Sequence, residues 1–269
     1  MLPHDGSPTG RRAGFTPGAT EPCDDAAVSD RHLPRRPPSP NGEPGDEPGT
    51  AGGRIGSPAV PAVVRRPLAA AAVVTGIAAV VLGMVVAGGS AGLPVDVGLR
   101  AAVAAWWGEP GRLALLIDLL GEPRVVAVVV VALVAGCLVL GRRRLAVVAI
   151  LGPALAVVLT TALKPLVGRT INGDNLAYPS GHATSSAALA LVAALLVVSV
   201  IDAGLVGASL LVVAAPVVAG GTMALAQIAL NAHYVTDTLG GLCVALAAVV
   251  AVAFVVDRAA GRWARRAVE

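Results

Sequence analysis

The chain has 269 residues, of which 55% are hydrophobic, 14% charged and 3% aromatic, and its mean hydropathy is +0.77. This is too apolar for an ordinary soluble domain, so the composition indicates an integral membrane protein. The net charge of +3 comes from arginines that cluster at the ends of apolar runs, which excludes a basic face for binding nucleic acid.

Residues 1–66 differ in composition from the rest of the chain. They hold 12 of the 20 prolines, and their eight arginines balance eight acidic residues. Without apolar periodicity, this composition predicts a disordered N-terminal tail. The tail lacks the early apolar core of a signal peptide and ends in Arg65-Arg66, so we expect it to stay attached on the cytoplasmic side.

Residues 67–257 predict an all-α membrane domain, a bundle of six transmembrane helices. Each crossing needs about 17 to 25 apolar residues. The runs that come near this length are Leu68–Gly88, Val125–Leu140, Leu145–Leu163, Ala183–Ile201, Leu205–Leu225 and Val235–Val256. The amphipathic stretch Arg112–Glu122 follows two tryptophans, so we expect an interfacial helix there. Residues 258–269 form a basic cytoplasmic tail.

Three arginine clusters set the orientation of these runs. Arg65-Arg66 precede the first run, Arg142 to Arg144 separate the second from the third, and four arginines within 258–266 follow the sixth. With both termini in the cytoplasm, all three clusters fall on the cytoplasmic side, as the positive-inside rule requires. The polar residues between the third and fourth runs, and those before the sixth, then lie on the outer side.

The polar interruption Ala177–Ser186 separates the third and fourth runs, and we expect chemistry there. Its Pro179-Ser180-Gly181 turn is followed at once by His182 at the start of an apolar helix. Amide groups at a helix N-terminus, next to an imidazole, suit the binding of an anion. A simple helix cap is the alternative, because serine before an apolar run commonly has only that role.

A second polar site precedes the sixth run, where His233 stands four residues before Asp237. On a helix this spacing places both side chains on one face, so the carboxylate can hold one ring nitrogen and leave the other basic. Such a histidine is a nucleophile or a metal ligand, and a satisfied polar pair at a helix start is the alternative. Ionisable groups beside membrane spans are costly, which favours a functional role.

His182 and His233 together provide what general acid and then general base catalysis needs. Lys164, the only lysine among twenty basic residues, and Arg169 add positive charge, while Ser180 and the turn amides add donors for phosphate oxygens. Snorkelling to the headgroups is the alternative for Lys164. A zinc site is the competing chemistry, but two histidines and one aspartate without further spaced ligands predict no metal and no cofactor.

These motifs together resemble the type 2 phosphatidic acid phosphatase superfamily, the lipid phosphate phosphatases. The family pattern is Lys-x6-Arg-Pro, then Pro-Ser-Gly-His, then Ser-Arg-x5-His-x3-Asp. The chain has Lys164, then Pro179 to His182, then His233-x3-Asp237, in the same order and on the matching helix ends. The resemblance spans roughly Val95 to Val256, including the amphipathic connector and the six-span layout.

The resemblance also implies roles for the residues that match. His233 would attack phosphorus to give a phosphohistidine, Asp237 would orient it, and His182 would protonate the leaving group and later activate water. The groups that would bind phosphate, with no metal required, are Lys164, Ser180 and the Gly181 amide.

Two positions depart from the family pattern. Ile171-Asn172 stand where Arg-Pro is expected, and Ala226-Gln227 stand where Ser-Arg is expected. Gln227 can donate a hydrogen bond, and Arg169 can reach inward from its loop as a replacement. Losing one charge-assisted donor from a transition-state clamp costs about two to three powers of ten in rate. Either the pocket is rebuilt around another substrate, or catalysis is weak or absent.

The sequence therefore predicts a cell-membrane phosphatase that removes phosphate from a lipid or polyprenyl carrier on the outer face. Its expected partners are that substrate and the surrounding membrane lipids. A non-catalytic member of the same fold that binds a phospholipid headgroup or a partner protein is the main alternative. A small transporter or scaffold, in which the polar loops only cap helices, is a third interpretation.

Overall fold

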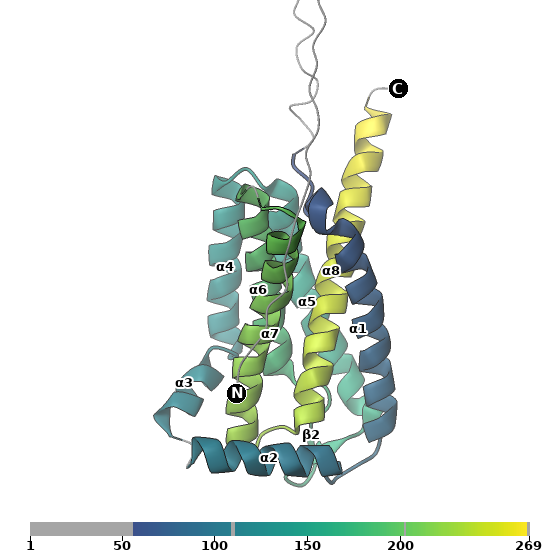
Figure 1. Cartoon of the computed structure of the whole chain (residues 1–269). Helices are drawn as coiled ribbons and strands as arrows, with labels where there is room; N and C mark the ends of the chain where they lie inside the picture. Colours follow the sequence, from purple (N-terminus) through teal and green to yellow (C-terminus); the bar gives the residue numbers. More distant parts are fainter. Residues whose placement is uncertain (1–55, 109–110, 202, 268–269) are drawn as a thin grey trace, which may run out of the picture. The chain divides into compact units, whose positions relative to one another are not determined.

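The computed structural model describes residues 56–108, 111–201 and 203–267, which form a bundle of helices (Figure 1). Its helices are α1 (Arg65–Val86), α2 (Pro94–Trp107), α3 (Arg112–Leu119), α4 (Pro123–Val139), α5 (Arg143–Val167), α6 (Gly181–Val200), α7 (Leu205–Ala229) and α8 (Val235–Arg266). A short 3-10 helix, η2 (Ala62–Val64), precedes α1. The strands β1 (Thr170–Ile171) and β2 (Asn175–Leu176) pair antiparallel in the loop between α5 and α6. The predicted all-α membrane bundle is confirmed.

Five of these helices are long and apolar enough to cross a membrane: α1 with its preceding turn, α5, α6, α7 and α8. A sixth crossing exists only if α3 and α4 count as one span, because the two helices meet at an angle of 55°. Pro123 is the first residue of α4, where its missing amide hydrogen costs nothing, and it fixes the point at which the chain turns. The predicted six-span layout therefore rests on this broken second span.

Helix α6 lies at the centre of the bundle and packs against α4, α5, α7 and α8. Its sequence is rich in alanine, and Ala183, Ala187 and Ala188 are fully buried. Such small residues let neighbouring backbones approach closely, which is how helices associate in membranes. By contrast, α1 exposes a row of valines and isoleucine, including Val73, Val74 and Ile77, as expected of a helix that faces lipid.

Helix α2 lies across the ends of the bundle, against α7 and α8 (Figure 1). The interfacial helix predicted at Arg112–Glu122 corresponds to α3 and the turn after it, whereas α2 is an additional helix that the sequence pattern did not indicate. Asp96 explains why α2 begins where it does, since its carboxylate accepts a hydrogen bond from the amide of Leu93 at 3.0 Å.

The segment just before α1 packs against the far end of α8. The amides of Ala59 and Val60, both fully buried, donate to the carboxylate of Asp257 at 2.8 and 3.2 Å. Arg65 and Arg144 form ion pairs with the same carboxylate. The predicted tail was expected to end at residue 66, but its residues 59 and 60 are packed in the structure, because their amides donate to a carboxylate of α8. Residues 1–55 lie outside the described residues.

Candidate active site

Lys164 stands in the last turn of α5 and points into the loop that follows. Its Nζ donates to the carbonyl oxygen of Leu176 at 2.8 Å. Gly168 ends the helix in the left-handed conformation, with φ of 64°, which glycine adopts without strain. The chain then returns through β1 and β2, so the lysine lies beside the segment that leads to α6.

The Pro-Ser-Gly turn forms the start of α6, as the sequence predicted. Ser180 is its N-cap, and the Ser180 hydroxyl accepts a hydrogen bond from the Ala183 amide at 3.4 Å. The amides of Gly181 and His182 open the helix and have no acceptor within it. A Cβ atom added to Gly181 would meet no atom within 4 Å, so there is open space beside this glycine. The positive end of the helix dipole and the space beside Gly181 together suit the binding of an anion.

The start of α8 lies directly against this turn. The Ser180 amide donates to the carbonyl oxygen of Asp237 at 3.0 Å, and the Thr184 hydroxyl donates to the carbonyl oxygen of Gly241 at 3.1 Å. A Cβ on Gly241 would lie 2.6 Å from the Ser180 carbonyl oxygen, and one on Gly240 would lie 2.3 Å from the Tyr178 ring. These two glycines therefore permit the contact that brings both histidine-bearing segments to the same end of the bundle.

His233 and Asp237 lie together, but not by helical stacking. Helix α8 begins at Val235 with Tyr234 as N-cap, so His233 precedes the helix. Asp237 folds back to accept the Tyr234 amide at 2.9 Å, which places its carboxylate beside the imidazole. The Nδ1 atom of His233 lies 3.7 Å from Asp237 Oδ2, longer than a hydrogen bond. Nδ1 is buried and has no hydrogen-bond partner among the described residues.

Arg169 is buried between two carboxylates and does not point into open space. Its guanidinium donates to Asp237 Oδ1 and to Asp96 Oδ2, each at 2.8 Å, and also to the Thr236 hydroxyl. The guanidinium carbon also lies 4.4 Å from the centre of the Tyr234 ring. Arg169 therefore holds Asp237 in place. The structure does not show Arg169 in the position predicted for it, where it would bind phosphate in place of the family arginine.

Asp96 completes this network from α2. Its carboxylate also accepts hydrogen bonds from the amide of Thr236 at 2.9 Å and from its hydroxyl at 3.0 Å. Burial raises the pKa of Asp96, but the hydrogen bonds from Arg169, Thr236 and Leu93 together outweigh it and hold that pKa below its ordinary value of 3.8. Asp96 and Asp237 each stand at the third position of a helix, so Arg169 joins two helix N-termini.

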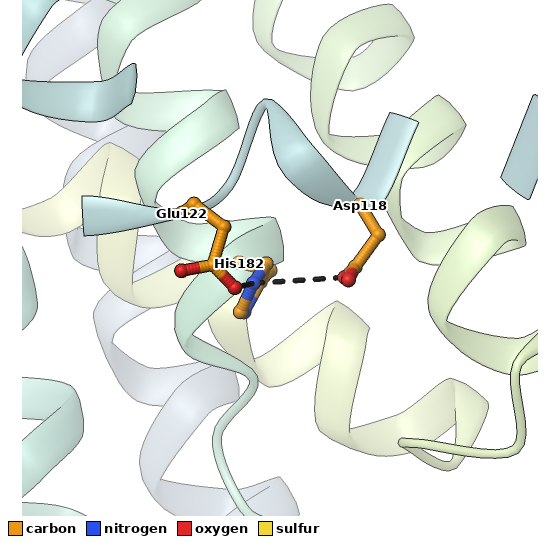
Figure 2. Close-up of side chains that lie close together, drawn as sticks. All are labelled: Asp118, Glu122 and His182. Carbon is orange, nitrogen blue, oxygen red and sulfur yellow. Dashed lines mark ion pairs between the residues drawn. The ribbon is translucent and has the colours of Figure 1, made fainter. Parts of the chain in front are cut away.

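His182 faces two carboxylates, one from Asp118 at the end of α3 and one from Glu122 just before α4 (Figure 2). Its Nε2 atom lies 3.6 Å from Asp118 Oδ1 and 4.0 Å from Glu122 Oε1. Nε2 is buried and makes no hydrogen bond to any described residue. Gly121 lies over the imidazole, where an added Cβ would be 2.2 Å from the ring. Only glycine lets the turn approach this closely.

Gln227 and Asn172, which stand where the resemblance predicts other residues, each make polar contacts. Gln227, which is 2% exposed, donates through Nε2 to Asp118, so it turns toward the carboxylate beside His182. Ile171 is buried in β1. Asn172 donates to the carbonyl oxygen of Asn231 at 2.7 Å, and Asn231 donates back to Asn172 Oδ1 at 3.3 Å. These two asparagines tie the β1–β2 loop to the segment before His233.

Asp96, Asp118 and Glu122 were missed by reasoning from the sequence. Eight of the 17 acidic residues lie within residues 1–66, so acidic residues are scarce in the apolar part of the chain. The same scarcity argument that singles out Lys164 would have singled out these three. The i, i+4 spacing of Asp118 and Glu122 was a further signal.

The arrangement can bind an anion and move a proton. Amides at the start of α6 and the Lys164 amine provide donors, and two imidazoles stand on adjoining segments. An imidazole whose Nδ1 faces a carboxylate leaves Nε2 as the basic atom.

Comparison with known protein families found a match in the second half of the chain. The sequence profile described as the PAP2 superfamily matches residues 145–260, which cover α5 to most of α8 and all three motifs. No curated protein and no solved structure matches the chain. The segment that holds all three motifs is therefore similar to the PAP2 superfamily, the family that the motifs resemble.

Proposed function

We propose that this protein is a membrane phosphatase that hydrolyses a lipid or polyprenyl (pyro)phosphate monoester through a phosphohistidine intermediate. The observation that carries the proposal is the hydrogen bond from the Ser180 amide to the Asp237 carbonyl oxygen at 3.0 Å. It joins the anion-binding start of α6 to the segment with His233. The match of residues 145–260 to the PAP2 superfamily supports a phosphatase-type fold.

The first step forms a bond between His233 and phosphorus. Nε2 attacks the phosphoryl group while the bond to the leaving oxygen breaks, and His182 gives a proton to that oxygen. Asp237, whose Oδ2 lies 3.7 Å from Nδ1, stabilises the positive charge that develops on the ring. The phosphate is held by Lys164, Ser180 and the Gly181 amide, whereas Gln227, expected from the sequence to join them, donates to Asp118 instead.

The second step releases phosphate. His182 takes a proton from water, the water oxygen attacks phosphorus, and the bond from phosphorus to His233 breaks. His233 is then free for another cycle, and inorganic phosphate leaves. No redox change occurs, and the proton taken from water replaces the one given to the leaving group.

A hydrocarbon chain on the substrate fits the surroundings of this site. A groove of about 230 Å³ between α1 and α5 is lined mainly by apolar side chains and includes Tyr178, two residues before Ser180. We propose that the lipid tail of the substrate lies in this groove while the phosphate reaches the start of α6. A water-soluble phosphate ester would leave the groove unused.

The extracytoplasmic position of the site belongs to the same proposal. Arg65 and Arg144 meet at Asp257 near the end of α8, whereas Lys164 and His233 lie at the opposite helix ends. The positive-inside rule favours the arginine-rich end as cytoplasmic. The site would then open on the outer face of the cell membrane, with both termini inside.

The test is phosphate release from a panel of lipid phosphates and polyprenyl phosphates by the purified full chain in detergent. We expect His233→Ala to lower release by about three powers of ten or more, and the native protein to carry acid-labile phosphate on His233 after rapid quenching. His32→Ala is the matched control and should behave as the native protein does. Equal release by native and His233→Ala protein would refute the mechanism.

A non-catalytic role is the second candidate. It is favoured by Ile171 and Gln227, which stand where the resemblance predicts arginines, and by the carboxylates that face His182. In that case the site holds a phospholipid headgroup without cleaving it. Tight binding of a lipid phosphate, with no release by the native protein, would support this role against hydrolysis.

A further inference from the structure

We propose that Asp118, Glu122 and His182 form a binding site for a divalent first-row transition metal such as Zn²⁺. The three side chains lie close together and come from the end of α3, the N-cap of α4 and the start of α6 (Figure 2). One ligand atom from each, the imidazole Nε2 and two carboxylate oxygens, lies within 4.8 Å of the others. The inference concerns metal binding, which the proposed phosphatase chemistry does not use.

The separations fit a shared ion better than they fit direct hydrogen bonds. Two ligands about 2.0–2.2 Å from a tetrahedral zinc ion are roughly 3.3–3.6 Å apart. Nε2 lies 3.6 Å from Asp118 and 4.0 Å from Glu122, which is beyond a hydrogen bond in both cases. Because Glu122 is half exposed, a rotation of its side chain can bring its oxygen nearer.

The imidazole points into this space without a partner. Nε2 is buried, and no described residue bonds to it. A buried polar nitrogen without a partner is costly, and a metal ion would satisfy its lone pair. An ion pair between His182 and the carboxylates is the competing arrangement, and it binds no metal.

The surroundings are built to hold these ligands in place. Gly121 allows the turn to lie on the imidazole, since a Cβ there would be 2.2 Å from the ring. Gln227 is buried and donates to Asp118, which fixes one carboxylate from outside the cluster. A hydrogen bond to a ligating carboxylate from a second residue is typical of metal sites.

Charge also favours a cation here. Two carboxylates beside the proposed phosphate site would repel a phosphate, and the family arginine that would offset them is replaced by Gln227. A dication neutralises both carboxylates. The mixed set of imidazole and carboxylates suits Zn²⁺ or Mn²⁺ better than Mg²⁺ or Ca²⁺, which prefer oxygen ligands alone.

One consequence rests on the proposed function. A metal on Nε2 of His182 occupies the lone pair that proton transfer needs, so metal binding and phosphate release exclude each other. The metal would then act as an inhibitor that sets how much of the protein is active.

The test of the site is metal binding by the purified full chain in detergent, with a tag free of histidine. We expect Zn²⁺ titration calorimetry and the visible absorption of bound Co²⁺ to report one site that is lost in His182→Ala. Glu122→Gln should weaken it about tenfold or more, and Asp174→Asn, at an exposed loop position, should leave it unchanged. Thermal melting checks that each variant folds.

The outcomes separate the site from the phosphatase. Equal Zn²⁺ binding by native and His182→Ala protein, no binding at all, or equally tight binding of Mg²⁺ would overturn the metal site. If the site binds Zn²⁺, saturating metal should abolish phosphate release by the native protein, and Glu122→Gln should need about ten times more Zn²⁺. Unchanged release at saturation would overturn the competition. Metal binding by a protein that releases no phosphate would instead refute the proposed function alone.

Discussion

Arg169 is the residue on which the geometry of the site depends most. It is 1% exposed, and it bonds to Asp96, Asp237 and Thr236, which come from two different helices. Removing one partner from a buried ion pair costs about 3–5 kcal/mol, since the other charges are left without compensation. Asp237 would then be free to turn away from His233.

We therefore predict that Arg169→Ala lowers kcat for lipid phosphate hydrolysis at least about tenfold with little change in KM, because Asp237 loses its position while the phosphate donors remain. Arg169→Lys should recover part of the loss, since a lysine keeps the positive charge but lacks the guanidinium that contacts both carboxylates. Arg100→Ala, in the neighbouring helix, is the control and should retain activity. A rise in KM alone would show instead that Arg169 binds phosphate directly.

At the scale of elements, α2 is fastened to the start of α8 through Asp96. Its carboxylate receives the amide and hydroxyl of Thr236 as well as Arg169, so an interfacial helix is bonded to the segment that carries His233. Because the folded-state pKa of Asp96 lies below its ordinary value of 3.8, ionised Asp96 stabilises the fold.

The pH dependence follows from the direction of that shift. The stabilisation is fully present above pH 3.8 and is lost as the pH falls below it, through the lowered native pKa. We expect the melting temperature in detergent to fall over that acid range. In Asp96→Asn, the melting temperature should be lower at neutral pH and should change less with acid. Parallel curves for the two proteins would contradict this role of Asp96.

The starts of α6 and α8 show how far helix boundaries could be predicted from the sequence. The Pro179-Ser180-Gly181 turn was placed correctly at the start of α6 because its local sequence determines the cap. The helical pairing expected of His233 with Asp237 was not observed, since the cap at Tyr234 shifts the helix start past the histidine. Hydrophobic periodicity locates a helix but not the residue at which it begins.

Over the whole molecule, two polar networks stand at opposite ends of α8. One surrounds Asp237 and the other surrounds Asp257, which accepts the amides of Ala59 and Val60. The six apolar runs and the end carrying the motifs could be predicted from hydropathy and arginine placement. The partners of Asp257, Asp96 and Asp118 could not be predicted, because each partner lies far away in the chain. The periodicity of a sequence indicates only which nearby residues share a face.

The distant network gives a test at this scale. Asp257→Ala leaves two buried amides without acceptors, each worth about 1–3 kcal/mol, so we expect a lower melting temperature in detergent. Phosphate release measured well below that temperature should remain as in the native protein, because Asp257 is far along α8 from His233. Asp174→Asn serves as the matched control for loss of a carboxylate. A large loss of kcat in Asp257→Ala would show that the two ends are coupled.

Gly240 and Gly241 have a consequence that concerns tolerance to change. They carry no reacting atom, yet they set how near α8 comes to Tyr178 and Ser180. A single methyl group at either position would have to push the helix and the turn apart, and His182 and His233 would separate with them. Alanine at either position should therefore impair hydrolysis as a catalytic substitution would, although it removes no reacting group.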